Sequence, residues 1–325
     1  MGRRRKMEAQ WSVAWTQLEN FYPPPLPQVL PWGGRWTRNT CPIDNLLSLI
    51  WAKGQADPAF VHKIGLSHDE RVLLQVLWEL SWGRVSEGKR RWAEHLAGMQ
   101  LPGRLAESLA AGGGSAPDLG ELDLHGREQE HFLSHFDLST LAMESRRFCA
   151  QCGHSATILL ASQYISIDYP ASLQKASLAE HLEDIVAGRH VSEVEQAALA
   201  CPSGCPPRAH LGPRVFRTES QWLFVLDARG LPMSAVGELP PQLRVDERVF
   251  GLAGVTLHSE SKLHFAAWML WKESWFFYDG EASPQLQPSS PKIVKETAEL
   301  YSPNFVVYLI CDDPDPLPSI SKLFL

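Results

Sequence analysis

The sequence predicts an α+β protein, because its helical and strand-forming stretches are segregated along the chain rather than alternating. Apolar residues recur at helical spacing in the first third, at about 43–55, 68–83 and 87–99. Two cysteine pairs then bracket a middle segment that is typical of strands, at about 157–170. The last third consists mainly of β-branched and aromatic runs, which favour strands.

Length and composition limit the possible classes of protein. The 325 residues (36.4 kDa) allow two domains, or one large domain with an insertion. A hydrophobic fraction of 44% with 21% charged residues excludes wholesale disorder. The net charge of −7 argues against a dedicated nucleic-acid binder, which usually carries a basic excess. We therefore expect a packed protein without a nucleic-acid partner.

Targeting signals give an expectation about location. No stretch of about 18 apolar residues predicts a membrane span, and no hydrophobic segment follows MGRRRK to form a secretory signal. We expect an intracellular protein, cytoplasmic or nuclear, without a membrane partner. Residues 1–35 are expected to be a tail that starts basic and continues as the proline-rich segment FYPPPLPQVLPWGG at 21–34.

The first helix of the chain starts at a cysteine. Apolar residues fall at helical spacing from Ile43 on, and Pro42 suits a first helical turn, where its missing N–H costs little. Cys41 is therefore expected at the helix N-terminus, where the orphan N–H groups and the helix dipole lower a thiol pKa. A cysteine so placed is a candidate nucleophile, with a purely structural cysteine as the alternative.

Four further cysteines have the spacing of metal ligands. Each of two tight turns can present two thiolates to one metal, and Zn²⁺ takes four sulfur ligands tetrahedrally. We expect a structural zinc; the alternatives are four unliganded cysteines or a CxxC redox site. The sixth cysteine, Cys311, ends an apolar run and is expected in the core. The proposed ligands are Cys149, Cys152, Cys201 and Cys205.

The segment between the helical part and the first cysteine pair is acidic. Residues 118–145 hold seven acidic residues and one arginine. This charge predicts a solvated helix face, or else an acidic surface for a basic partner. Beyond it, a short helix is expected at about 178–187. Strands are expected at about 215–216, 222–226, 250–258, 264–271, 274–278 and 305–311.

The last third places a histidine and an aspartate on neighbouring predicted strands. In adjacent antiparallel strands, His264 and Asp279 can lie side by side. An Asp that accepts from one imidazole nitrogen fixes the tautomer and leaves the other nitrogen for a thiol. The alternative for such a pair is a structural hydrogen bond. His258, at the end of the preceding strand, is the rival base.

Taken together, these motifs resemble the ubiquitin-specific protease family of papain-like cysteine proteases, over roughly residues 36–312. The segment NTCPIDNLL at 39–47 resembles the family's cysteine box. The segment CAQCGHS at 149–155, with the strand that follows, resembles the start of its fingers subdomain. The histidine box is matched by Val255, His258, His264, Phe265, Trp275, Tyr278 and Asp279.

The resemblance implies a papain-like fold: a helical thumb (36–145), β-rich zinc-bearing fingers (146–212) and a β palm (213–325). It implies a thiol-dependent isopeptidase that removes ubiquitin or a ubiquitin-like modifier. Cys41 would be the nucleophile, His264 the base and Asp279 its orienting partner, with Asn39 and backbone N–H groups as oxyanion donors. Structural Zn²⁺ and modifier conjugates are the implied cofactor and partner; the oligomeric state stays open.

Several positions depart from the family pattern, among them the neighbours of the predicted base. Leu263 and Phe265 flank His264 where Gly and Tyr are usual, and Gly280 replaces a second acid. Two alternative functions therefore stay open. One is a catalytically weak or inactive ubiquitin-binding module, and the other is a SUMO-type isopeptidase.

Overall fold

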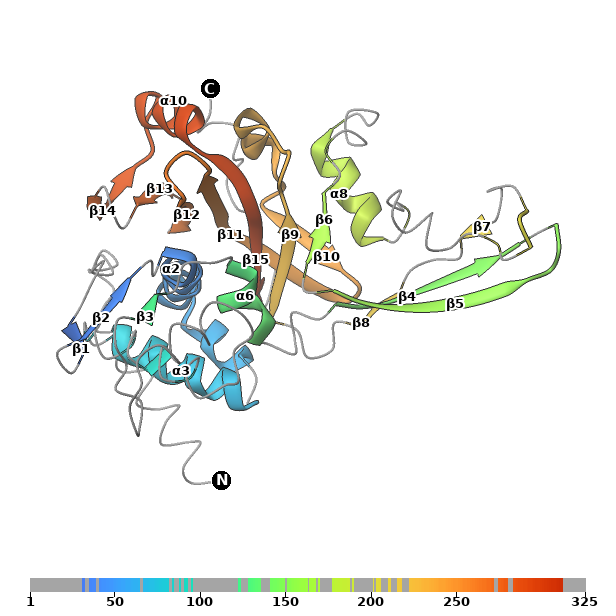
Figure 1. Cartoon of the computed structure of the whole chain (residues 1–325), viewed down its shortest axis with the longest axis horizontal. Coiled ribbons are helices and arrows are strands. Elements are labelled where there is room, and N and C mark those ends of the chain that lie inside the picture. The colour runs from blue at the N-terminus through green and yellow to red at the C-terminus, as the bar shows by residue number, and fades with distance from the viewer. Residues whose placement is uncertain are drawn as a thin grey trace. The chain divides into compact units, whose positions relative to one another are not determined.

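The chain forms two compact units in a computed structural model (Figure 1). One unit comprises Met1–Phe136 with Ala253–Tyr301, and the other comprises Asp137–Leu252 with Ser302–Leu325. The structure describes residues 31–32, 35–38, 41–64, 67–81, 84, 88, 91–92, 95, 122–123, 128–135, 141–149, 151–162, 164–167, 169, 177–187, 189, 201, 203–205, 210–211, 215–217, 222–271, 274–279 and 283–311.

The first unit starts with the helices that the apolar spacing predicts. Helix α2 (Cys41–Ala56) begins at the expected cysteine and buries nearly every residue of its first ten. Helix α3 (His68–Ser81) is preceded by a capping box. In this box the backbone N–H of Glu70 donates to Ser67 Oγ at 3.3 Å, and that of Ser67 donates to Glu70 Oε2 at 2.8 Å. A 3₁₀ helix (Pro58–Lys63) joins the two helices.

Four antiparallel strands in the order β14-β13-β12-β11 form the sheet of this unit, with β11 belonging to it from Ala253 on. Helix α2 packs against β12. The strands are β11 (Arg248–Ser259), β12 (His264–Trp271), β13 (Ser274–Asp279) and β14 (Ser283–Pro288). The unit also holds β1 (Pro31–Trp32), β2 (Arg35–Arg38), β3 (Leu122–Asp123), α6 (Glu128–His131), a 3₁₀ turn (Leu133–His135) and α10 (Pro291–Leu300).

A glycine lets α2 approach this sheet closely. A Cβ built on Gly254 of β11 would overlap the carbonyl oxygen of Trp268 in β12 and the side chain of Leu49 in α2. The carbonyl is fixed by strand pairing, so the overlap cannot be relieved by a rotamer change. Gly254 therefore sets the distance between the helix that carries Cys41 and the strands that carry the histidine.

We expect Gly254→Ala to lower the free energy of unfolding by about 1–3 kcal/mol, because it overpacks the contact between α2 and the sheet. Urea unfolding followed by tryptophan fluorescence measures the change. Gly251→Ala on the same strand is the matched control, since its Cβ would make ordinary contacts of 3.6 Å to Cys311 Sγ and 3.9 Å to the Leu309 carbonyl oxygen. Equal midpoints for the two variants would contradict this role of Gly254.

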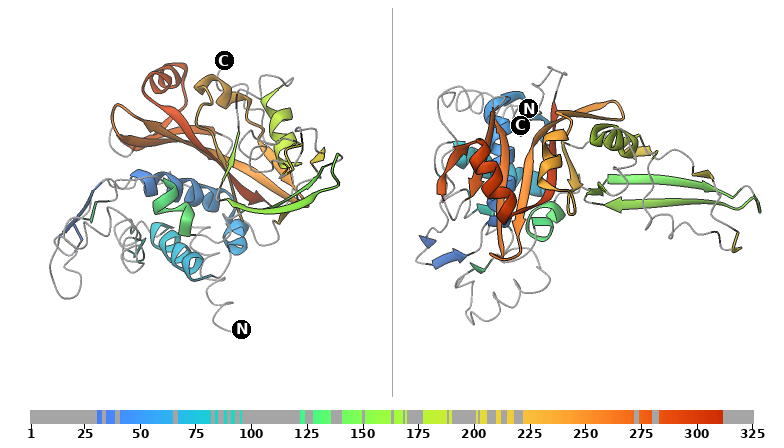
Figure 2. Two further views of the ribbon diagram at one scale, coloured as in Figure 1. Left: turned by 45° about the vertical axis from the view of Figure 1, so that its right-hand side comes forward. Right: turned by 90° about the horizontal axis from the view of Figure 1, so that it is seen from above.

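The second unit contains a long hairpin and a separate set of strands (Figure 2). In the hairpin, β4 (Leu141–Phe148) pairs with β5 (Ser155–Ser162) over all eight positions. Strand β4 also pairs with β7 (His210–Leu211) and β8 (Val215–Arg217). Elsewhere in the unit, β15 (Ser302–Cys311) pairs with β9 (Leu223–Asp227), which lies parallel to β6 (Ile165–Ser166). The remaining elements are β10 (Gln242–Val245), α8 (Leu178–Val186) and a 3₁₀ helix (Met233–Glu238).

Two expectations from the sequence are wrong. Residues 141–145 of the acidic segment are the start of β4 and not a helix face, because pairing with β5 and β8 overrides their weak local preference. Cys311 is half-buried at the end of β15, where its Sγ donates to the Val249 carbonyl oxygen at 3.5 Å.

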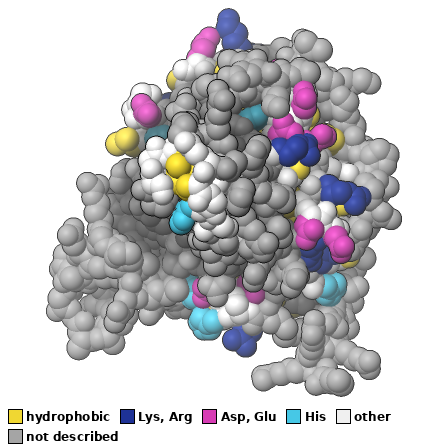
Figure 3. Space-filling view, turned by 90° about the vertical axis from the view of Figure 1, so that its right-hand side faces the viewer, with side chains coloured by type: hydrophobic (Ala, Val, Ile, Leu, Met, Phe, Trp, Pro, Cys, Tyr) yellow, Lys and Arg dark blue, Asp and Glu magenta, His cyan; other side chains and the backbone are white. Residues whose placement is uncertain are grey.

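One face of the described surface carries both signs of charge. Figure 3 shows one face on which the coloured Lys and Arg side chains lie among Asp and Glu side chains rather than apart from them. Within the described part of the chain, no helix has the length and apolar character needed to cross a membrane.

Candidate functional site

Cys41 is the first residue of α2 and is half-buried. The backbone N–H of Phe265, the residue after His264, hydrogen-bonds to its thiol. Two buried carboxylates also act on it: Asp44, one turn along the helix, and Glu128 of α6, which accepts a hydrogen bond from Thr256 Oγ1 at 2.6 Å. The structure thus brings the cysteine against the strand that carries the predicted base.

The pKa of Cys41 moves opposite to the sequence expectation. Burial raises the pKa of this thiol from 9.0 to about 12, and the charges of Asp44 and Glu128 add to the rise. The N–H groups of Phe265 and of Cys41 itself lower the pKa, but by less. Desolvation outweighs the helix N-terminus here, so the resting form of Cys41 is the neutral thiol.

We expect the alkylation rate of Cys41 by iodoacetamide to keep rising with pH through pH 9 without levelling off. Only the thiolate reacts, and a rise in pKa of 3 units (12 − 9) reduces its fraction about a thousandfold at pH 8. Peptide mass spectrometry of Cys41 over a pH series measures the rate, with Cys311 as an internal reference. A plateau near pH 7 would contradict this expectation and indicate a preformed thiolate.

His264 and Asp279 form the predicted pair. His264 Nε2 lies 2.8 Å from Asp279 Oδ1, and both side chains are buried. With Nε2 donating to the carboxylate, Nδ1 is the nitrogen that carries the lone pair. The imidazole is thereby held in the tautomer that accepts a proton at Nδ1.

Strand register explains why Asp279 binds His264 and not His258. Ala267 pairs with Tyr278, so the same register places Ala266 opposite Asp279. His264 is two residues from Ala266 and is therefore on the same face, as a diagonal neighbour of Asp279. His258 pairs with Phe265 and stacks on its ring at 4.7 Å, so it belongs to the other face. Burial lowers the pKa of His258.

Tyr301 is a functional candidate that the sequence analysis missed. Its hydroxyl donates to Asp279 Oδ2 at 2.6 Å, and its ring meets the His264 ring edge-on at 6.4 Å. It follows α10, a helix whose start is marked by Ser290 as N-cap and Pro291 in the first turn. That Ser-Pro signal was available in the sequence, although nothing local linked Tyr301 to Asp279. Asp279 thus has one oxygen on the histidine and the other on this tyrosine.

Leu263, just before His264, has a left-handed backbone with φ of 49° and is 63% exposed. Left-handed geometry costs a non-glycine residue roughly 1–2 kcal/mol. This conformation explains why a glycine suits the position in the family that the sequence resembles. Asn39, the expected oxyanion donor, lies outside the described residues.

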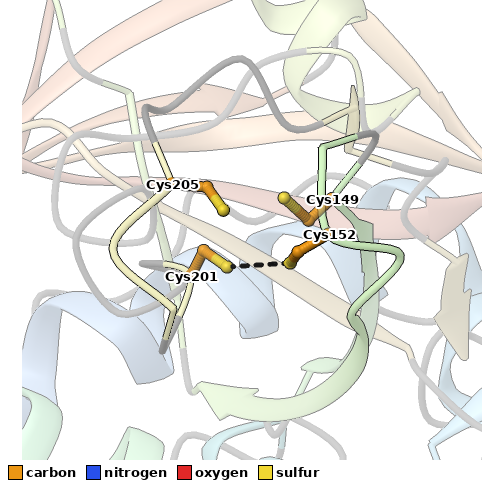
Figure 4. Close-up of side chains that lie close together, drawn as sticks. All are labelled: Cys149, Cys152, Cys201 and Cys205. Atoms are coloured by element: carbon orange, nitrogen blue, oxygen red, sulfur yellow. Dashed lines mark hydrogen bonds between the residues drawn. The ribbon is translucent and has the colours of Figure 1, made fainter.

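The four predicted zinc ligands form one cluster in the second unit. Their sulfur atoms all lie within 4.8 Å of one another and point toward a common centre (Figure 4). Cys152 Sγ and Cys201 Sγ are 3.5 Å apart, close to the roughly 3.8 Å edge of a tetrahedral ZnS₄ site. Gly153 and Gly204, with φ of 72° and 68°, make the two tight turns possible.

The donor set of this cluster fits a divalent cation. Backbone N–H groups of Cys152 and Gln151 lower the pKa of Cys149, and those of Ser203, with a smaller contribution from Cys205, lower the pKa of Cys201 to about 6. Desolvation, followed by hydrogen bonds with the other thiols, raises the pKa of Cys205 to about 12. A central cation would remove this competition between neighbouring thiols for negative charge. The residues present therefore match a Cys₄ zinc site.

Comparison with known proteins gives likeness in structure but not in sequence. No family model and no curated protein matches the chain. The Saccharomyces cerevisiae Pan2 pseudoubiquitin hydrolase–RNA exonuclease module in complex with A7 RNA aligns over 95% of this chain and 58% of that chain, with a TM-score of 0.50 and 10% identity.

Two further structures align at lower TM-scores. The Neurospora crassa Pan2 catalytic unit gives 0.48 at 13% identity, over 90% of this chain and 58% of that one. A SAGA DUB module with Ubp8 bound to monoubiquitin gives 0.45 at 14% identity, over 84% and 67%. The chain thus spans less than two thirds of both Pan2 chains. The likeness at 0.50 supports a fold of the ubiquitin-hydrolase type, and at 10% identity it concerns the fold alone.

Proposed function

We propose that this protein is a thiol-dependent isopeptidase that removes ubiquitin or a ubiquitin-like modifier from other proteins. The observation that carries the proposal is the buried pair of His264 on β12 and Asp279 on β13, 2.8 Å apart. The residue after His264, Phe265, hydrogen-bonds to the Cys41 thiol through its backbone N–H. A positioned base beside a helix-terminal cysteine is the arrangement that thiol acyl transfer requires.

In the proposed reaction, Cys41 Sγ attacks the carbonyl carbon at the modifier's C-terminus while its proton passes to His264 Nδ1. His264 then protonates the leaving lysine amine, the C–N bond breaks, and a thioester remains. Water, deprotonated by the same nitrogen, hydrolyses this thioester and regenerates the thiol. Because the resting thiol is neutral, His264 acts as a general base during attack and not through a standing ion pair.

The remaining assignments belong to the same proposal. Asn39 and backbone N–H groups at the start of α2 would stabilise the oxyanion. The thumb is assigned to residues 36–145, the zinc-bearing fingers to 146–212 and the palm to 213–325. The partner would be a modifier conjugate, and the location cytoplasmic or nuclear.

Electrophile probes test the proposal. Ubiquitin and SUMO carrying C-terminal electrophiles are incubated with the purified zinc-loaded protein, and adducts are read by intact mass. We expect one adduct in the wild-type protein and none in Cys41→Ala, and the probe that reacts names the modifier. An adduct that persists in Cys41→Ala, or none with either probe from folded protein, would contradict the proposal as stated.

A non-catalytic ubiquitin-binding module is the second candidate. It is favoured by the pKa of Cys41, raised to about 12 by burial, which disfavours the reactive thiolate. In this case the probes leave the mass unchanged, while ubiquitin without an electrophile still binds in a titration. Binding without labelling therefore selects the second candidate over the first.

A further inference from the structure

We propose that His68, Asp69 and His95 form a second metal site, for Zn²⁺ or a similar transition-metal dication, in the unit that carries Cys41. One ligand atom from each of the three residues lies within 4.8 Å of the other two. His68 and Asp69 open α3, whereas His95 is a helical residue 26 positions further along the chain. A bound metal would join these two segments.

The distances agree with shared coordination. His95 Nε2 lies 3.1 Å from Asp69 Oδ1, and the rings of His68 and His95 have centroids 5.4 Å apart. Ligands about 2.1 Å from a tetrahedral Zn²⁺ stand roughly 3.4 Å from one another. The 3.1 Å distance between Asp69 Oδ1 and His95 Nε2 is already close to this distance between ligands. A small rotation of the exposed His68 ring would bring the third ligand into place.

Packing holds His95 in place, whereas His68 is exposed to solvent. The side chain of His95 is only 5% exposed and that of Asp69 is 20% exposed. The buried Trp92 contacts His95 at a ring distance of 5.3 Å and is itself held by Phe132 at 5.1 Å, which limits the rotation of His95.

The ligand types select the class of metal. Two imidazoles and one carboxylate suit Zn²⁺, Ni²⁺ and Cu²⁺, whereas Mg²⁺ and Ca²⁺ prefer sites made of oxygen alone. Because His68 is exposed, a water molecule can take the fourth position. The site differs from the four-cysteine cluster in its ligands and lies in the other unit.

Calorimetric titration of Zn²⁺ into protein whose four-cysteine cluster is already loaded tests this proposal. We expect one additional binding event in the wild type, weakened at least about tenfold in His68→Ala and in Asp69→Asn, because each loses a ligand. His62→Ala is the matched control, since His62 is an exposed histidine of the same unit outside the cluster.

The absence of a second event, or an equal affinity in the wild type and His68→Ala, would overturn the metal site and leave a direct contact between His95 and Asp69. Circular dichroism of each variant checks that the fold is retained; His68 is exposed, so its replacement is expected to leave the fold intact. Titration with Mg²⁺ in place of Zn²⁺ should give no heat of binding. The test uses no modifier substrate, so its outcome is independent of the proposed function.

Discussion

His264→Ala lowers kcat for the hydrolysis of a fluorogenic modifier substrate by about 10²–10⁴-fold, as expected for the loss of a general base. His258→Ala leaves kcat nearly unchanged, because register puts His258 on the opposite face of the strand from Asp279. Steady-state kinetics with the modifier that labels Cys41 measures both values. Equal losses in the two variants would contradict the assignment of the base.

Substitutions of Asp279 and of Tyr301 are expected to lower kcat by different amounts. Asp279→Asn is expected to cost nearly as much as His264→Ala, because an amide can hold the wrong imidazole tautomer. Tyr301→Phe removes one hydrogen bond to a charged oxygen and is expected to lower kcat by about 10- to 100-fold, since such bonds contribute roughly 1.5–3 kcal/mol.

Two readouts separate positioning by Tyr301 from a general loss of stability. The acidic limb of the pH–rate profile should shift to higher pH in Tyr301→Phe, because its hydroxyl stabilises the charged form of Asp279. Tyr308→Phe is the matched control: its hydroxyl donates to the Pro240 carbonyl oxygen at 2.9 Å in the other unit. An unshifted profile with lower thermal stability alone would indicate a structural role for Tyr301.

Removal of zinc from the four-cysteine cluster is expected to have the second large effect, which is on folding. We expect one tightly bound Zn²⁺ per chain from the cysteine cluster, and chelation or Cys201→Ser should unfold the segments that meet there. Structural zinc contributes about 10–16 kcal/mol of apparent binding free energy in zinc-finger peptides, most of which is folding free energy. Elemental analysis counts the metal, and circular dichroism follows the hairpin β4–β5.

The sixth cysteine supplies the control for this experiment. Cys311→Ser removes a half-buried thiol outside the cluster and should keep both the zinc and the fold. Protein that is free of zinc yet fully folded would contradict a structural metal. A mass 2 Da lower than that of the reduced chain would instead indicate a disulfide, which is the redox alternative for the CxxC turn.

Much of the architecture followed from local patterns. The starts of α2 and α3 were predicted within a few residues, because apolar spacing and, for α2, a proline in the first turn are signals that act over one or two turns. The strand β12 was predicted from its apolar run at the observed bounds. Helix α10 was missed although its Ser-Pro start is a local signal. Strand β4 was missed because its mixed polar sequence forms a strand only through pairing with β5, β7 and β8.

In the candidate site, too, the local features could be predicted from the sequence. The sequence by itself determined which residue types were available: a cysteine at a helix start, two closely spaced cysteine pairs, and a histidine and an aspartate on neighbouring strands. Spacing limits which side chains of one turn or hairpin can meet, so each cysteine pair and the His264–Asp279 pair needed no long-range information. The four cysteines converge as predicted, but the meeting of the two pairs, 49 positions apart (201 − 152), is a long-range contact.

Only the tertiary structure decided the electrostatics of Cys41 and the contact of Tyr301 with Asp279. The pKa of Cys41 depends on burial and on the carboxylate of Glu128, which is 87 positions away (128 − 41). Tyr301 reaches Asp279 because α10 returns the chain to β13. Desolvation and long-range contacts depend on every element packed around a group, so no local pattern can specify them.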